Sequence, residues 1–305
     1  MKPGAISPQE AAARQPGLRW PATRYFVSPR HRLLYCPIPK VACSSLKVWW
    51  AEYELGPAYF QEIPIGEVHR QLGARFEYQH QAEVLGEAPL VDPRWFRFVF
   101  VRNPWARLVS AFVNKFVNYT HNAATLVDEF RSRLPRRMVR QMVRPAAADD
   151  ILPPWWLLRG AAAWREQFTF RQFVNHLATC NLNRADGHWR PQSRLLGKTE
   201  FHFIGRFEHL DRDFAELNRL LGRQPALRRV NATQYTAEAV MHACVSDWPL
   251  ARLRELPAAP PYRSFYTPSL AETVARLYAD DVQRLGYEFD DSSRWETAVS
   301  ARQAA

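Results

Sequence analysis

Three short apolar segments of this chain each lead through a tight turn into an amphipathic helix. They cover residues 33–36, 96–101 and 201–204, and in the helix after each one apolar residues recur at helical spacing. Strands that alternate with helices are joined by right-handed crossovers into a mainly parallel sheet. The sequence therefore predicts a three-layer α/β fold in which helices flank a central, mainly parallel sheet.

Capping residues set the expected helix boundaries. The first helix should begin near Ser44, and the second should begin at Pro104 with Asn103 as its N-cap. A last helix should span residues 267–285. The turns between strands and helices are then short and lie at the carboxyl edge of the sheet, where ligands of such sheets bind.

The core folding unit is expected to span residues 31–290, with a helical insertion at about 118–190. Residues 1–30 are rich in Pro, Ala and Arg and are predicted to form a flexible extension, and residues 291–305 a C-terminal tail. The apolar run 153–158 is either core or an exposed patch that touches a ligand or lipid. The second alternative would allow peripheral membrane contact.

The charge of the chain favours anionic ligands. Lys and Arg exceed Asp and Glu by 41 to 30, a formal net charge of +11. Most of the basic residues are arginines, and they are spread along the whole chain. A nucleic-acid-binding protein would instead show a basic stripe interleaved with aromatic residues, so we expect no nucleic-acid partner.

Targeting and metal-binding signals are not found in the sequence. The N-terminal segment has no apolar run typical of a signal peptide, and no stretch approaches the roughly 18 apolar residues of a membrane span. The four cysteines show no CxxC spacing and predict neither a disulfide framework nor a metal site. We expect a soluble, cytoplasmic protein without a bound metal.

The turn at residues 37–43 has the chemistry of an anion-binding cradle. A helix that starts directly after such a turn directs backbone N–H groups and its positive dipole end at one point, and Lys40 adds a full charge. Ser44 and Ser45 add hydroxyl donors. The arrangement is P-loop-like, although the GxxxxGK[ST] pattern is absent, which disfavours an ordinary NTPase or kinase. The alternative is that Ser44 only caps the helix and Lys40 is solvated.

A second anion site is predicted at the end of the next strand. Arg102 ends that strand, and Ser110 lies two turns into the following helix, so a guanidinium and a hydroxyl can face the same rim. Two anion sites at neighbouring strand ends suit a nucleotide that carries phosphates at both its 5' and its 3' position.

Both segments resemble motifs of one enzyme family. Residues 34–47, LYCPIPKVACSSLK, are similar to the 5'-phosphosulfate-binding motif of the carbohydrate sulfotransferases that include the chondroitin 4-O-sulfotransferases. Residues 97–112, RFVFVRNPWARLVSAF, are similar to the 3'-phosphate-binding motif of that family. Ser45 and Leu46 replace its usual Asn-Trp, and we expect no N-terminal anchor like that of its Golgi members. The likeness continues in weaker form through residues 188–192, 203–208 and 278–287.

The resemblance implies the fold and chemistry of a PAPS-dependent sulfotransferase. An acceptor oxygen would attack the sulfur of PAPS (3'-phosphoadenosine-5'-phosphosulfate) in line, and PAP (3'-phosphoadenosine-5'-phosphate) would leave, with no metal. Lys40 would be catalytic, because positive charge must meet the charge that develops on the oxygens. The implied donor-binding residues are Pro39, Lys40, Val41, Ala42, Cys43, Ser44, Ser45, Lys47, Arg102, Ser110 and Arg263. For Lys47 a solvated position, and for Arg263 a plain surface loop, are the alternatives.

A carbohydrate or glycoconjugate hydroxyl is the expected acceptor, and its proton needs a general base. Histidine titrates in the right range. His80 lies between the two motifs, in the segment from which the related heparan sulfate 2-O-sulfotransferases take their catalytic histidine, and is the predicted base. His188, His69 and Glu208 are the alternatives.

Two other function classes compete with a sulfotransferase. A nucleotide-dependent kinase would use the same cradle but would need Mg²⁺ ligands and a glycine-rich loop that the sequence does not show. A non-catalytic glycan- or nucleic-acid-binding module would use only the positive charge.

Overall fold

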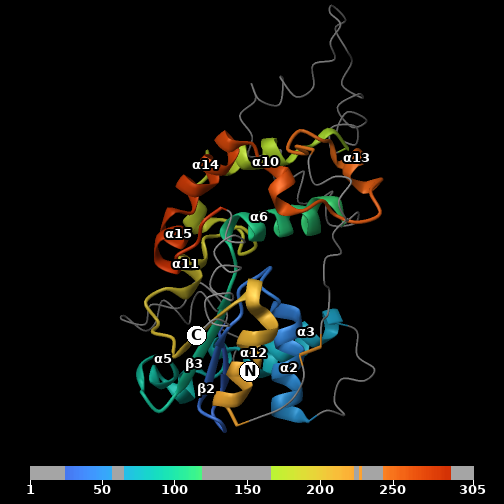
Figure 1. Ribbon diagram of the computed structural model, residues 1–305. Helices are drawn as coiled ribbons and strands as arrows, with labels where there is room; N and C mark the ends of the chain where they lie inside the picture. The colour runs from blue at the N-terminus through green and yellow to red at the C-terminus, as the bar shows by residue number, and fades with distance from the viewer. Residues whose placement is uncertain (1–24, 57–64, 119–165, 223–226, 229–242, 290–305) are drawn as a thin grey trace, which may run out of the picture. The chain divides into compact units, whose positions relative to one another are not determined.

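The computed structural model describes residues 25–56, 65–118, 166–222, 227–228 and 243–289 (Figure 1). The chain divides into two compact units, one within Met1–Asn103 and Asp186–Ala232, the other within Pro104–Ala185 and Thr233–Ala305. The apolar run 153–158 lies outside the described residues. The domain boundaries expected from the sequence stay a prediction.

The first unit is built on a sheet with the strand order β1-β2-β3-β4. The strands are β1 Phe26–Ser28, β2 Leu33–Cys36, β3 Phe96–Val101 and β4 Phe203–Arg206. β2, β3 and β4 run parallel, and β1 pairs antiparallel with β2. The predicted mainly parallel α/β sheet is confirmed. β1 is a strand that the sequence did not predict, and it falls inside the segment assigned to the N-terminal extension.

The third predicted strand begins two residues later than expected. The backbone N–H of His202 still donates to the carbonyl of Arg97 at 2.8 Å. The N–H of Arg97, however, donates to the His202 ring nitrogen Nδ1 at 3.1 Å instead of to a backbone carbonyl. The His202 ring thus replaces a backbone carbonyl as hydrogen-bond acceptor at this end of the strand pair, and regular pairing between β3 and β4 starts at Phe203.

Aromatic side chains join the sheet of the first unit to two of its helices, α2 (Cys43–Leu55) and α12 (Leu210–Leu220). Tyr35 of β2 and Phe98 of β3 stack with ring centroids 4.9 Å apart. Trp49 of α2 meets Phe98 edge-on at 6.0 Å and Phe214 of α12 at 5.5 Å. Both helices therefore cover the same face of the sheet, and Figure 1 shows them beside β2 and β3. In its described residues this unit also contains the helices α3 Ile65–Phe76, α4 Ala82–Leu85, α5 Ala88–Val91 and α11 Gln192–Leu196 and the 3₁₀ turns Tyr78–His80 and Phe207–His209.

A close approach between β3 and β4 explains one glycine. Gly205 is paired with Phe100, whose ring lies over it: a Cβ at position 205 would be 2.3 Å from Cε1 of Phe100. Any larger residue would force the ring or the strand to move. The glycine of the segment FIGR is therefore required by packing.

The second unit is helical in the residues that the structure describes. Its elements are α6 Pro104–Phe112, a π-helix Val113–Val117, α10 Phe170–Leu177, α13 Leu250–Arg254, α14 Pro268–Leu277, α15 Ala279–Leu285 and the 3₁₀ turns Leu182–Arg184 and Tyr262–Phe265. α6 begins at Pro104 as predicted. The single helix expected over 267–285 is instead two helices, since buried Tyr278 between them has φ −114° and ψ 30°, outside the helical region.

Phenylalanine side chains form the core of the second unit. Phe112 of α6 lies 5.3 Å from Phe170 and 5.7 Å from Phe173, measured between ring centroids. Phe265 lies 5.3 Å from Phe170 and 6.2 Å from Phe112. The apolar face that the sequence indicated for α6 is thus confirmed, and it packs against α10.

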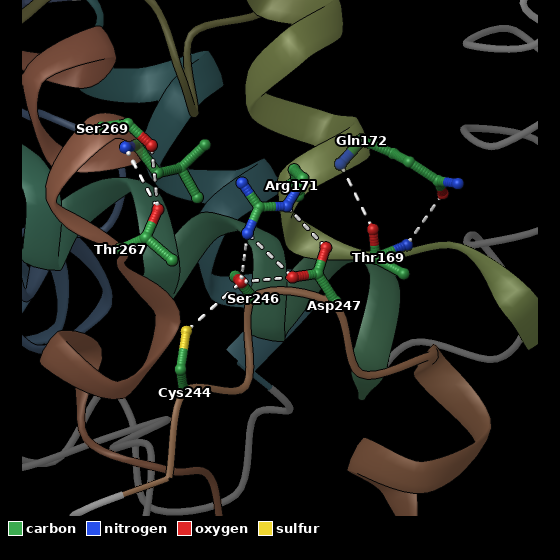
Figure 2. Close-up of polar contacts among 9 residues, drawn as sticks. Thr169, Arg171, Gln172, Cys244, Ser246, Asp247, Thr267 and Ser269 are labelled. Carbon is green, nitrogen blue, oxygen red and sulfur yellow. Dashed lines mark hydrogen bonds and ion pairs between the residues drawn. The ribbon is translucent and has the colours of Figure 1, made fainter.

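A polar cluster fixes the segment before α13 to the start of α10 (Figure 2). Arg171 donates through Nε and Nη2 to the two carboxylate oxygens of Asp247 at 2.6 and 2.8 Å, and through Nη2 to Ser246 Oγ at 3.0 Å. The Arg171 bonds hold the pKa of Asp247 below its usual value. Thr169 and Gln172 complete a capping box at the same helix end. The cluster therefore has a structural role in joining two segments.

Candidate donor-binding site

The turn that carries Lys40 has an unusual backbone. Lys40 and Ala42 both have positive φ, 68° and 49°, and the turn contains no glycine. A left-handed conformation costs a residue with a side chain roughly 1–2 kcal/mol. Such strain persists only where the surrounding structure holds it, and it concentrates at functional sites. The backbone geometry therefore indicates that this turn is a functional site, as the sequence motif does.

Helix α2 begins at this turn without a side-chain cap. The capping position is Ala42, which makes no capping hydrogen bond. Ser44, the alternative cap considered from the sequence, lies instead inside the first turn of α2. The positive end of the helix dipole thus lies next to Lys40. Five residues of the predicted cradle are partly exposed, namely Pro39, Lys40, Ala42, Cys43 and Ser44, whereas Val41 and Ser45 are buried.

Arg102 holds the turn from the neighbouring strand. Its guanidinium Nη1 donates to the carbonyl oxygen of Lys40 at 3.0 Å, and its Cζ lies 4.0 Å from the ring centroid of Phe207. Arg102 is 6% exposed. The structure therefore brings Lys40 and Arg102 together, as expected for anion sites at adjacent strand ends, and it adds a role for Arg102 that the sequence did not indicate.

The backbone at the end of β3 is fixed by side chains distant in sequence. The amide of Gln192, which is fully buried, accepts from the Arg102 N–H at 2.9 Å and donates to the Arg102 carbonyl at 2.7 Å. Glu208 accepts from the N–H of Asn103 at 2.8 Å. Glu208, one of the alternative bases, is thus engaged in holding the residue before α6.

The loop before Gln192 reaches the Lys40 turn. A Cβ on Gly187 would lie 3.7 Å from Cγ of Pro39, so the two residues face each other at close range. Next to Gly187, Nδ1 of His188 lies 2.5 Å from Oδ1 of Asp186. The sequence offered His188 only as an alternative base and did not connect it with Asp186.

Two other predicted residues lie nearer β1. Nζ of Lys47 lies over the ring of Phe26, 5.1 Å from its centroid. His80 is about half exposed, with Nε2 3.9 Å from the Glu77 carboxylate. Glu77 in turn bridges to Phe26. The side chain of the remaining alternative base, His69, lies outside what the structure describes.

Ser110 and Arg263 belong to the second unit. Ser110 is buried in α6, 4% exposed. Arg263 is exposed, and its Cζ lies 5.4 Å from the ring of Tyr262, whose hydroxyl donates to the carbonyl of Phe289 at 2.6 Å. The roles of both residues toward a 3'-phosphate stay predictions.

The strand that leads into the turn contributes no negative charge. Burial raises the pKa of the Cys36 thiol and of the Tyr35 hydroxyl well above their usual values. Both groups are therefore neutral at physiological pH. The positive charges of Lys40 and Arg102 are not offset from this side of the turn.

Neither a membrane span nor a metal cluster is found in the described part of the chain. None of its helices combines the length and apolar character needed to cross a bilayer. The same residues contain no group of three or more His, Cys, Asp or Glu side chains placed to hold a metal ion.

Comparisons with known proteins agree with the geometry. A family model described as "Sulfotransferase family" matches residues 23–288. Carbohydrate sulfotransferase 14 of Danio rerio is 26% identical over 68% of this chain and 48% of its own length. Carbohydrate sulfotransferase 11 of Rattus norvegicus is 27% identical over 64% of this chain and 52% of its own length. Carbohydrate sulfotransferase 12 of Mus musculus is 30% identical over 86% of this chain and 59% of its own length.

The matched part is about half the length of these relatives. The comparison with solved structures gave no significant match. The family match nevertheless covers most of the described residues, including both strand-end turns. With its α/β sheet and the strained lysine turn, this chain belongs to the sulfotransferase family.

Proposed function

We propose that this chain transfers a sulfuryl group from PAPS to a hydroxyl of a carbohydrate or glycoconjugate. The acceptor oxygen forms a bond to sulfur while the bond between sulfur and the bridging oxygen of the 5'-phosphate breaks. PAP leaves with that electron pair, and the acceptor proton passes to a general base. The donor chemistry follows from the family, and the carbohydrate acceptor is suggested by the names of the relatives.

The observation that supports this proposal most is the turn at Lys40. The turn combines a strained, glycine-free backbone, a lysine and the start of α2, and Arg102 holds it in place. Positive charge at fixed positions stabilises the charge that develops on the oxygens of the transferring group. Lys40 is thus proposed as the catalytic cation.

The remaining donor-binding assignments are part of the same proposal. The 5'-phosphosulfate would bind at the Lys40 turn, and the 3'-phosphate would be bound by Arg102, Ser110 and Arg263. The sequence predicts His80 as the base, with His188, His69 and Glu208 as alternatives, and a cytoplasmic location likewise stays a prediction. Neither a metal nor a nucleic acid is required by this mechanism.

Thermal unfolding tests the donor assignment. A ligand that binds only the folded protein stabilises it by about 2.7 kcal/mol at a concentration 100 times its Kd. We expect PAP to raise the Tm clearly, and ATP with Mg²⁺ or an oligonucleotide to raise it little. A larger effect of ATP with Mg²⁺ would favour a kinase, and a larger effect of the oligonucleotide a nucleic-acid-binding module.

Labelled PAPS tests the acceptor class. We expect the protein to transfer label to at least one member of a panel of desulfated chondroitin, desulfated dermatan and desulfated heparan. Stabilisation by PAP without transfer to any of them would retain the donor assignment and reject these glycans as acceptors.

A further inference from the structure

The loop that contains Asp186 and His188 lies against the lysine turn, within the same compact unit. Gly187, between these two residues, faces Pro39, the residue before Lys40. Four residues after His188, the Gln192 amide binds the backbone of Arg102, whose guanidinium binds the Lys40 carbonyl. Contacts on both sides of His188 in the sequence thus hold this residue near the Lys40 turn.

Asp186 shapes this loop with both its backbone and its side chain. Its carbonyl accepts from the N–H groups of Trp189 and Arg190 at 3.1 and 2.8 Å. Its carboxylate Oδ1 accepts from the N–H of His188 at 2.8 Å, as in an ordinary Asx turn. The contact of Oδ1 with Nδ1 of the His188 ring at 2.5 Å goes beyond what that turn needs.

This contact selects the tautomer of the ring. A neutral imidazole whose Nδ1–H donates to a carboxylate has its lone pair on Nε2. Nε2 can then accept a proton, and the carboxylate stabilises the imidazolium that forms. The side chain of His188 is 30% exposed, so part of the ring is open to solvent.

His80 differs in this respect. Its nearest carboxylate, Glu77, is 3.9 Å from Nε2, beyond hydrogen-bonding distance. Nε2 also lies 3.3 Å from the side-chain amide of Gln79. Its segment is tied to the residue before β1 by the bond from Tyr78 N–H to the Tyr25 carbonyl at 2.7 Å. Among the described residues, none of these contacts connects His80 with Lys40 or Arg102.

We propose that His188 is the general base of sulfuryl transfer and that Asp186 is its positioning residue. This inference rests on the proposed function. As the acceptor oxygen bonds to sulfur, its proton passes to Nε2 of His188, and the electron pair of the breaking S–O bond leaves with PAP. Protonated His188 remains paired with the Asp186 carboxylate until it releases the proton to water.

The test compares histidine variants in transfer of label from PAPS to whichever desulfated glycan of the panel the wild type labels. We expect His188→Ala to lower turnover roughly 10²- to 10⁴-fold. The Tm increase caused by PAP should be kept, because no donor group is assigned to His188. Added imidazole should restore part of the turnover by filling the space of the lost ring.

Three companion variants separate catalysis from folding. His188→Gln keeps a polar side chain of similar size and should lose turnover without loss of stability. Asp186→Asn should lower turnover about 10- to 100-fold without imidazole rescue, because the ring is still present but held wrongly. His31→Ala is the control, since His31 lies before β2, at the other end of that strand from Lys40, and packs on Tyr53.

Two results would overturn the inference. One is that His188→Ala and His188→Gln keep turnover within about threefold of wild type, or lose it together with PAP stabilisation and without rescue. The other is that His80→Ala shows the large loss that imidazole rescues, which would assign the base to His80. Failure of the proposed function looks different, because the wild type itself would then transfer no label and gain no stability from PAP.

Discussion

The sequence predicts an anion site at both strand-end turns of the first unit, but the two turns are built in opposite ways. After β2, the backbone is strained at Lys40 and Ala42, and several of its residues are partly exposed. After β3, Arg102 and Asn103 are buried, and neither has a positive φ. Side chains of Gln192 and Glu208 bind their backbone groups there.

The difference suggests a division of labour between the turns. An accessible turn beside a helix start can bind an anion, whereas a buried turn whose backbone is held by hydrogen bonds from other side chains positions its own side chains rigidly. Arg102 connects the two, because it extends from the rigid turn to the carbonyl of Lys40. Substitutions on either side should therefore affect chemistry, ligand binding and stability to different degrees.

The largest effect is expected for Lys40→Ala. Alanine can adopt the left-handed backbone at this position about as well as lysine, so the substitution removes the charge and spares the turn. We expect turnover to fall roughly 100-fold or more, measured with labelled PAPS. Lys198→Ala, at an exposed lysine of the same unit, should retain normal turnover. Near-normal turnover of Lys40→Ala would reject Lys40 as the catalytic cation.

Arg102→Ala should weaken donor binding through both turns. Loss of charged hydrogen bonds costs about 1.5–3 kcal/mol, which corresponds to roughly a 10- to 150-fold higher Kd for PAP, measured by calorimetry. Adenosine-5'-phosphosulfate, which lacks the 3'-phosphate, should also bind more weakly, because the Lys40 turn loses its support. Arg102→Lys keeps the charge but not the planar guanidinium group. Its Kd for PAP should therefore lie between those of the wild type and Arg102→Ala.

Ser110→Ala provides the contrast, because it should weaken the binding of PAP and leave the binding of adenosine-5'-phosphosulfate unchanged. If Arg102→Ala behaved in the same way, Arg102 would act on the 3'-phosphate alone. The hydrogen bond to the Lys40 carbonyl would then have no part in binding the donor.

Local signals in the sequence predicted the framework of the fold. The apolar runs of β2 and β3 and the Asn103-Pro104 helix start depend on neighbouring residues, and the structure places them as expected. β1 was missed because Phe26–Ser28 is a three-residue strand between polar and basic residues. It pairs antiparallel with β2 across the connection 29–32, and this connection contains none of the Asn-Gly, Asp-Gly or Gly-Gly pairs that signal a hairpin in a sequence.

For the site, the sequence indicated the residues but not their supports. The lysine turn follows from a strand, a lysine and a helix start within a dozen residues. The hydrogen bonds between the Gln192 amide and the Arg102 backbone join positions 90 residues apart. The contact of Gly187 with Pro39 spans an even longer separation. Neither has a periodicity or spacing that a single sequence reveals. The dual role of Arg102 was hidden for the same reason.

Gln192→Ala should destabilise the protein without removing any group assigned to the substrate. It leaves the buried N–H and carbonyl of Arg102 without these partners, which costs about 1–3 kcal/mol for an unsatisfied group. The free energy of unfolding, from urea titration, should fall by about that amount. Gln283→Ala, at an exposed position of α15, is the control and should change it little. Unchanged stability of Gln192→Ala would mean that the turn after β3 does not need the hydrogen bonds from Gln192.

The smallest effect, and the most direct test of backbone strain, is expected for Ala42→Gly. Glycine relieves a left-handed strain of roughly 1–2 kcal/mol but loses about 0.4–1 kcal/mol through the greater freedom of the unfolded chain. The free energy of unfolding should therefore rise by about 0.8 kcal/mol. Ala51→Gly, in the interior of α2, makes the same chemical change where φ is helical and should instead lower stability by at least 0.5–1 kcal/mol. Opposite signs for the two variants, measured by urea titration, would support strain at the lysine turn, and equal losses would contradict it.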